Sequence, residues 1–182
     1  MSVRPIQTRF RGVLYRSRTE ARWAAFFESL QLKTQYEAEG FDLPNGESYL
    51  PDFFIPSLPL YVEVKGETPT ADERRKAYWL YDLTGVPVLI VIGDPSMRRG
   101  EIFNSFFDAE LGPPKNSFFG GCRRCNQIAV AYEWENGHGY EPFGVCGDPM
   151  RCAEREASQE TDRIEAAIQM SLSERFGVHP AK

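Results

Sequence analysis

The sequence predicts an α/β fold in which helices flank a mixed central sheet, and two kinds of pattern support this prediction. Two Ser/Thr-x-x-Glu capping boxes each precede a stretch with apolar residues at helical spacing. Short β-prone segments lie between and after these stretches. One of them, Leu60–Val64, precedes the second helical stretch, and the apolar run Val86–Ile92 follows it. A strand–helix–strand order needs a crossover connection, which predicts a parallel pair of strands within the sheet.

The first half of the chain supplies the elements before this unit. The capping box Ser17–Glu20 predicts a helix over about Thr19–Leu30. We expect a strand at Thr34–Glu37 and, after the turn Leu43–Gly46, another at Tyr49–Phe54. All of these segments are short, as is usual for elements of a small α/β domain.

The second capping box, Thr70–Glu73, predicts a helix that ends near Thr84. Further along, Glu101–Glu110 is expected to form a short helix, and Ala153–Phe176 a longer polar one. That longer helix carries a narrow apolar stripe of Ile164, Ile168 and Leu172, which predicts docking on the body of the protein or on a second subunit. The expected division is a core at 1–111, a cysteine-bearing segment at 112–152, and a C-terminal helix and tail at 153–182.

Composition and charge narrow the class of protein. The chain has 182 residues, 42% hydrophobic and 26% charged, which predicts a folded protein. No apolar run is long enough to cross a bilayer and no secretory signal is recognisable, so we expect a cytoplasmic location. The net charge of −5 is unusual for a nucleic-acid-binding protein, but residues 1–33 contain seven Lys and Arg against two Glu. Such a segment suits phosphate binding, or it forms an ordinary solvated edge.

Two short motifs carry the most chemical information, Pro51-Asp52 and Glu63-Val64-Lys65. Alternate residues of a strand share a face, so Glu63 and Lys65 point the same way. If the two strands pair as a hairpin, Asp52 lies near Glu63, and two carboxylates form a hard-oxygen site for Mg²⁺ or Mn²⁺. The structural alternatives are a turn residue at Asp52 and a solvated ion pair between Glu63 and Lys65.

These motifs, in the order helix, strand, strand, helix, strand, resemble the PD-(D/E)xK nuclease superfamily, which includes restriction enzymes, junction resolvases and transposon end-cutting subunits. The resemblance spans about Arg9–Ile92 and implies a restriction-endonuclease-like core. It also implies that Asp52 and Glu63 bind Mg²⁺ and that Lys65 assists the nucleophile.

Other residues match features of this family outside the core motif. The family carries a Glu on the helix before the sheet, and Glu20 matches it; a helix-capping role would explain Glu20 equally well. Phage and transposon members have an opening similar to Tyr15-Arg16-Ser17. By this resemblance, the candidate DNA-binding residues are Arg16, Arg18, Arg75 and Lys76.

The four cysteines are Cys122, Cys125, Cys146 and Cys152. Between the pairs lie two β-prone runs, Gln127–Trp134 and Tyr140–Val145, around a Gly-rich turn. Four thiolates around a hairpin resemble a zinc ribbon with one structural Zn²⁺, although five residues separate the second pair, more than the usual knuckle has. Two disulfides or four separate thiols are the alternatives.

Together these features predict a metal-dependent DNA endonuclease that hydrolyses phosphodiester bonds with an activated water. The expected partner is DNA and not a membrane, with a homodimer or a larger nucleoprotein assembly as the expected higher-order state. Three alternatives remain open at this point. They are an RNA-directed nuclease, a non-cleaving nucleic-acid-binding protein of the same fold, and an interaction protein built around the zinc-ribbon-like segment.

Overall fold

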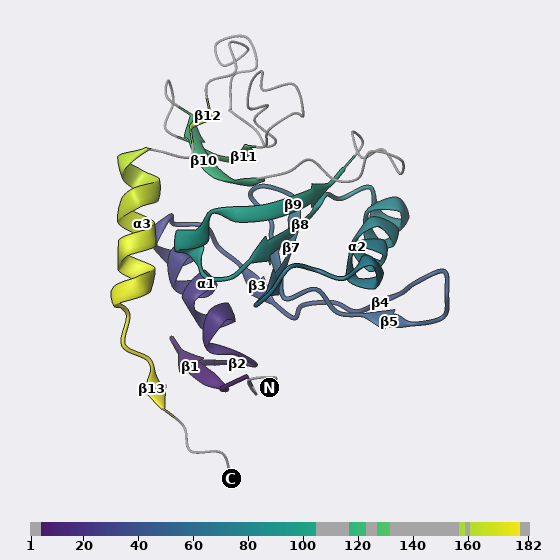
Figure 1. The fold of residues 1–182 in the computed structure, drawn as a ribbon, viewed down its shortest axis with the longest axis horizontal. Coiled ribbons are helices and arrows are strands. Elements are labelled where there is room, and N and C mark those ends of the chain that lie inside the picture. Colours follow the sequence, from purple (N-terminus) through teal and green to yellow (C-terminus); the bar gives the residue numbers. More distant parts are fainter. Residues whose placement is uncertain (1–4, 105–116, 123–126, 132–156, 159–160, 179–182) are drawn as a thin grey trace.

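A mixed five-stranded sheet forms the centre of the molecule, as the computed structural model shows for residues 5–104, 117–122, 127–131, 157–158 and 161–178 (Figure 1). The strand order is β3-β6-β7-β8-β9. These strands span Gln35–Tyr36, Phe53–Ile55, Leu60–Lys65, Val88–Ile92 and Arg99–Phe103. The β7–β8 pair is parallel and the other three pairs are antiparallel, so the predicted α/β class, mixed sheet and crossover are confirmed.

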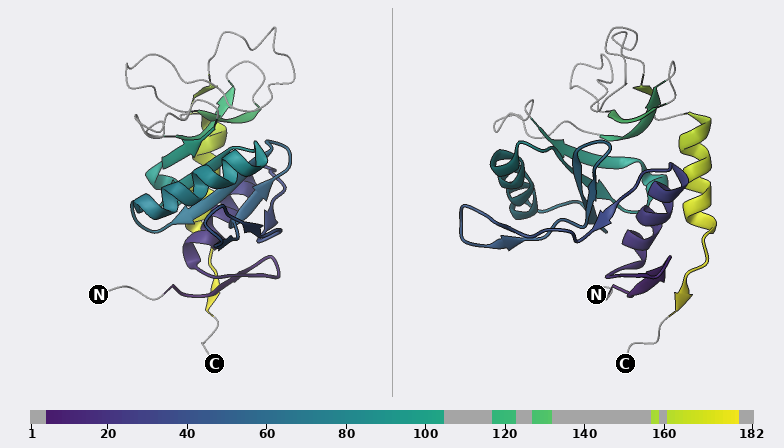
Figure 2. Two further views of the ribbon diagram at one scale, coloured as in Figure 1. Left: turned by 90° about the vertical axis from the view of Figure 1, so that its right-hand side faces the viewer. Right: turned by 180° about the vertical axis from the view of Figure 1, so that it is seen from behind.

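Helices cover both faces of this sheet (Figures 1 and 2). Helix α1 (Arg18–Ser29) packs on the face that carries Val62 and Val91, whereas α2 (Ala71–Thr84) packs on the face that carries Val88 and Ile90. Helix α3 (Asp162–Ser173) lies along α1, on the side away from the sheet, with Ile164 and Ile168 buried. The predicted apolar stripe therefore docks on the body of the protein.

The capping residues set where α1 and α2 begin. The Ser17 hydroxyl accepts a hydrogen bond from the Glu20 amide at the start of α1. At α2 the capping box is complete, because Thr70 accepts from the Glu73 amide and the Glu73 carboxylate accepts from the Thr70 amide. Each cap satisfies amides that have no partner within the helix, so both helices start within a residue of the predicted position.

Three smaller sheets surround the central one. The first joins the two ends of the described chain, in the order β13-β1-β2 (Gly177–Val178, Thr8–Phe10 and Val13–Tyr15). The second has the order β11-β10-β12 (Ile128–Ala131, Phe118–Cys122 and Ala157–Ser158), and the third is the β4–β5 hairpin (Phe41–Asp42 and Ser48–Tyr49). Phe118 and Phe119 of β10 pack against Trp23 and Phe26 of α1, so this segment contributes to the main core.

Some predicted elements differ from the observed ones. The helix expected at Glu101–Glu110 is wrong at its start, because β9 extends to Phe103 as a strand antiparallel to β8, and residues 105–110 lie outside the described part. The strand expected at Tyr49–Phe54 is two strands, β5 and β6. The C-terminal helix begins at Asp162 and not at Ala153, because Ala157–Ser158 pairs as β12.

The hairpin expected between Gln127–Trp134 and Tyr140–Val145 is only partly described. Its first arm contains β11, which pairs with β10 upstream, and its second arm lies outside the described residues. Of the helices in the described ranges, none has the length and apolar character needed to cross a membrane.

Candidate active site

The register of the sheet brings the two predicted carboxylates together. Phe53 pairs with Val62 across the antiparallel β6–β7 ladder, so the residue before Phe53 lies opposite the residue after Val62. Those residues are Asp52 and Glu63. Both side chains are buried, with relative exposures of 2% and 6%, although carboxylates are normally solvated. The hairpin expected from the sequence is therefore present, and its geometry makes a close acidic pair.

Asp52 is held by one backbone and one side-chain donor. Its Oδ2 accepts a hydrogen bond of 2.7 Å from the Val64 amide, and its Oδ1 accepts one from the Arg16 guanidinium. Burial and the neighbouring Glu63 carboxylate nevertheless raise the pKa of Asp52 to about 7, with a further contribution from Glu20. The site thus holds more negative charge than its own donors neutralise.

Glu63 shares its environment with Lys65. The Lys65 ammonium lies 3.0 Å from Glu63 Oε1 and 2.9 Å from the Glu73 carboxylate at the start of α2. Burial lowers the pKa of Lys65, but the two carboxylates outweigh this effect and raise it, so the ammonium form is favoured at neutral pH. The other oxygen, Glu63 Oε2, is buried and has no hydrogen-bond partner among the described residues.

Ser17 caps α1, and Glu20 in the first turn of that helix faces the acidic cluster. Its carboxylate accepts hydrogen bonds from the Ser17 hydroxyl at 2.7 Å, the Arg16 amide at 3.1 Å and the Tyr36 hydroxyl at 2.6 Å. It also contributes to the raised pKa of Asp52. Glu20 thus holds Arg16 and Ser17 at the start of α1 and also lies near Asp52, because β2 and α1 meet beside the β6–β7 hairpin.

The proposed DNA-binding residues separate into two groups. Arg16 belongs to the acidic cluster, and Arg18 opens α1 with an exposed side chain. Arg75 and Lys76 lie on α2 and contact other carboxylates. Arg75 bonds to Asp72 and stacks 5.2 Å from the Trp79 ring, whereas Lys76 lies 2.6 Å from Glu47 and 3.5 Å from Asp72.

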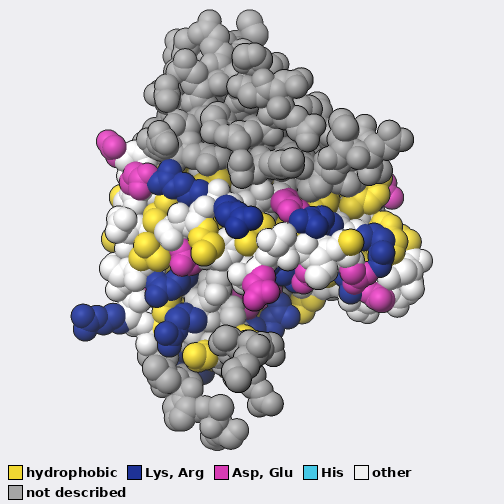
Figure 3. Space-filling view, in the orientation of Figure 1, with side chains coloured by type: hydrophobic (Ala, Val, Ile, Leu, Met, Phe, Trp, Pro, Cys, Tyr) yellow, Lys and Arg dark blue, Asp and Glu magenta, His cyan; other side chains and the backbone are white. Residues whose placement is uncertain are grey.

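Charge on the surface is mixed, with no single basic lobe on the face in view. Figure 3 shows Lys and Arg side chains interspersed with Asp and Glu over that face of the molecule. Because Arg75 and Lys76 are paired with Asp72 and Glu47, binding of a phosphate by either residue would require it to leave a carboxylate partner.

The site also contains four residues that the sequence did not predict as site residues, which are Tyr36, Glu37, Tyr49 and Glu73. Glu37 lies 2.8 Å from Arg16 Nε, and Glu73 holds Lys65. Burial and the neighbouring Glu63 carboxylate raise the pKa of Tyr49 well above its usual value. For Glu73 the signal was present in Thr70-x-x-Glu73, but it indicated only a helix cap.

The residues present fit a divalent cation, although the carboxylates do not form a complete set of metal ligands. Within the described ranges, no three His, Cys, Asp or Glu side chains converge as ligands. Arg16 and Lys65 instead bond to Asp52 and Glu63. The fit rests on the unsatisfied Glu63 Oε2 and on the repulsion that raises the pKa of Asp52, because an added cation would relieve both.

The predicted zinc ligands lie mostly outside the described part of the chain. Cys122 ends β10, where its backbone pairs with Ala157 of β12. Cys125, Cys146 and Cys152 lie outside the described residues.

Comparison with known proteins gives no family assignment, because neither a scan against protein-family models nor a search of curated proteins found a match.

Proposed function

We propose that this chain is a metal-dependent DNA endonuclease with a restriction-endonuclease-like core of the PD-(D/E)xK type. The observation that carries the proposal is the buried pair Asp52 and Glu63. Asp52 immediately precedes β6, Glu63 lies opposite it on β7, and Lys65 lies beside them. A buried carboxylate whose pKa is raised by burial and by a neighbouring carboxylate, as that of Asp52 is, is costly to a fold, and such arrangements are concentrated at functional sites. A turn residue or a solvated ion pair would leave these side chains exposed.

Each residue has a role in phosphodiester hydrolysis. Asp52 and Glu63 would hold Mg²⁺ or Mn²⁺, which when bound polarises the phosphodiester and lowers the pKa of a water molecule. Lys65, which stays protonated beside Glu63 and Glu73, would donate hydrogen bonds that orient the attacking water or a phosphate oxygen. Glu20 would add negative charge at the side of α1 and keep Arg16 and Tyr36 in place.

The proposal includes a structural Zn²⁺ bound by Cys122, Cys125, Cys146 and Cys152. Its support is the clustering of all four cysteines within 31 residues of sequence, 122–152. Tetrahedral thiolate sites of this kind supply folding energy to small segments.

Cleavage of labelled nucleic acids tests the enzymatic proposal directly. Duplex, nicked, branched and single-stranded DNA, together with a matched RNA, would be incubated with Mg²⁺, Mn²⁺ or EDTA. We expect metal-dependent cutting of DNA by the wild type and a loss of at least about 100-fold in Asp52→Asn and Glu63→Gln, the range expected when a group that stabilises the transition state is removed. Asp82→Asn makes the same chemical change at an exposed position of α2 and should cut normally.

Three outcomes would contradict the proposal. Cutting that survives in both site variants would remove the acidic pair from the mechanism. Cutting of RNA alone would change the substrate class. An absence of cutting, with equal DNA binding by the wild type and Asp52→Asn, would indicate a binding protein.

A further inference from the structure

We propose that Arg16 is an internal counter-ion that a divalent cation displaces from the acidic cluster. Once displaced, its guanidinium would face solvent and be available to a DNA phosphate. The inference rests on the proposed function and adds a coupling to it, because metal binding and phosphate binding would then share one arginine.

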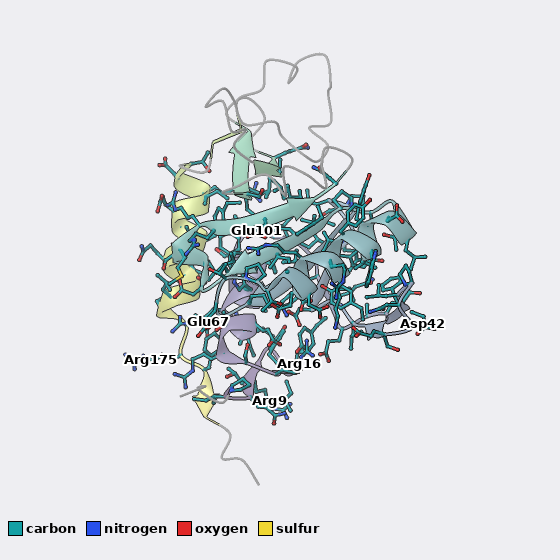
Figure 4. The ribbon with its side chains drawn as sticks, turned by 45° about the vertical axis from the view of Figure 1, so that its right-hand side comes forward. Arg9, Arg16, Asp42, Glu67, Glu101 and Arg175 are labelled. Atoms are coloured by element: carbon teal, nitrogen blue, oxygen red, sulfur yellow. The ribbon has the colours of Figure 1, made fainter. Side chains whose placement is uncertain are left out.

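The geometry around Arg16 supplies the first support. Three carboxylates from three parts of the fold converge on its guanidinium. Asp52 accepts a hydrogen bond from it, Glu37 lies 2.8 Å from Nε, and Glu20 lies 4.0 Å from Nε. Figure 4 shows Arg16 near the start of α1, well away from Asp42 on the β4–β5 hairpin. A single cationic group therefore offsets part of the negative charge that a metal would also offset.

Burial indicates which partner can move. The side chains of Asp52 and Glu20 are only 2% and 8% exposed, whereas that of Arg16 is 52% exposed. Asp52 is fixed by the Val64 amide, and Glu20 by Ser17 and Tyr36. Asp52 and Glu20 thus stay in place, and the guanidinium can leave toward solvent by a change of rotamer.

The backbone of Arg16 does not need to follow. Its amide donates to Glu20 Oε2 at 3.1 Å and lies 3.1 Å from the Tyr36 hydroxyl. These contacts anchor the main chain while the side chain remains free to rotate about its own bonds. Release of the guanidinium would therefore leave its Cα beside the site, within reach of a bound substrate.

Electrostatics then makes the two cations competitors. The guanidinium occupies Asp52 Oδ1, while the Val64 amide occupies Oδ2. A divalent ion at this carboxylate would meet a fixed positive charge unless Arg16 moved away. By thermodynamic linkage, the free energy with which Arg16 stabilises the metal-free site reduces the free energy of cation binding by the same amount.

Calorimetric titration with Ca²⁺ alone, in the absence of DNA, tests this competition. We expect Arg16→Gln to bind Ca²⁺ at least about 5-fold more tightly than the wild type, the lower end of usual coupling strengths. Arg16→Lys keeps the positive charge but lacks the planar guanidinium, so its affinity for Ca²⁺ should lie between those of the wild type and Arg16→Gln. Lys33→Gln removes a charge from an exposed position outside the cluster and should match the wild type. Equal or weaker binding by Arg16→Gln would overturn the inference.

A second measurement on the wild type covers the case in which Arg16→Gln fails to fold. The Nε–H resonance of Arg16, identified by its loss in Arg16→Lys, should shift when Ca²⁺ is added, and an unchanged resonance would overturn the displacement. Failure of the inference can also be separated from failure of the proposed function. Ca²⁺ binding that Asp52→Asn abolishes but Arg16→Gln leaves unchanged would remove only the displacement, whereas no Ca²⁺ binding by the wild type would remove both.

Discussion

At the scale of single residues, the site stores unfavourable electrostatic energy at Asp52. The Arg16 and Val64 donors lower the pKa of this carboxyl, but burial and the charges of Glu63 and Glu20 outweigh them. Since ionisation of Asp52 is opposed in the folded protein, the metal-free site is less stable than the same fold with a neutral group there. A bound cation would reverse that penalty, and this links stability to metal binding.

This balance gives a prediction about pH. The folded pKa of Asp52 is raised to about 7 from its ordinary value of 3.8, so the native state holds the proton more tightly than the unfolded chain does. The resulting stabilisation is complete below about pH 4 and is lost as the pH rises toward about 7. Asp52→Asn has no proton to lose. Between pH 5 and pH 8 in EDTA, we therefore expect the Tm of Asp52→Asn to fall less than the Tm of the wild type. The two decreases should differ by at least about 2 °C, the effect of about 1 kcal/mol in a domain of this size.

Thermal unfolding followed by circular dichroism, at both pH values and with each protein, measures this difference. Adding Ca²⁺ at pH 8 should raise the Tm of the wild type more than that of the variant. Parallel pH dependence in the two proteins would show that the Asp52 proton contributes nothing to stability.

The sequence predicted the central residues of the site because strand geometry connects them. Alternation along β7 relates Glu63 to Lys65, and hairpin pairing relates Asp52 to Glu63. Glu37 has no such signal, since it follows the two-residue strand β3 with a positive φ of 46° and reaches the site only through Arg16. The periodic patterns of strands (two residues) and helices (3.6 residues) carry no information about that contact.

At the scale of elements, helices with explicit caps were predictable and β9 was not. Strand β9 has apolar side chains only at its last two residues, where Ile102 packs toward α1 and Phe103 packs toward α2. Its sequence therefore shows no alternation of apolar and polar residues. Its position depends on long-range contacts. Gly100 of β9 accepts a hydrogen bond of 3.0 Å from the Ser117 amide, which connects the central sheet to the segment leading into β10.

Close packing at Gly100 gives a prediction about stability. A Cβ at this position would lie 2.5 Å from the Ser117 carbonyl oxygen and 2.9 Å from the Ile90 carbonyl oxygen. Both are backbone atoms that cannot rotate away, so Gly100→Ala should destabilise the fold by about 1–3 kcal/mol. Gly40→Ala is the matched control, because its Cβ would meet only the Tyr49 oxygen at an ordinary 3.9 Å. Chemical denaturation of both variants measures the effect, and equal midpoints would show that β9 and the Ser117 segment can separate at little cost.

At the scale of the whole molecule, one hydrophobic core joins segments that are far apart in the sequence. Trp23 of α1 contacts Phe118 and Phe119 of β10, and its indole N–H donates to the Gly93 carbonyl at the end of β8. Helix α3 adds Ile164 to the same core. The expected division at residue 111 is a prediction from a linker-like sequence, whereas the packing of Phe118 depends on contacts that no local pattern displays.

This shared core determines how loss of zinc should affect the protein. If the four cysteines bind zinc as proposed, elemental analysis should find about one Zn²⁺ per chain, and Cys122→Ser or Cys125→Ser should lower that content. Because Cys122 ends the strand that carries Phe118 and Phe119, zinc removal should lower the Tm of the single main transition, with no separate early transition. Calorimetry together with Trp fluorescence measures this, and Asp82→Asn, which changes an exposed carboxylate of α2 and should keep both its zinc and its Tm, is the control. An unchanged Tm in zinc-free protein would contradict this prediction, because it would mean that zinc does not stabilise the core that contains Phe118 and Phe119.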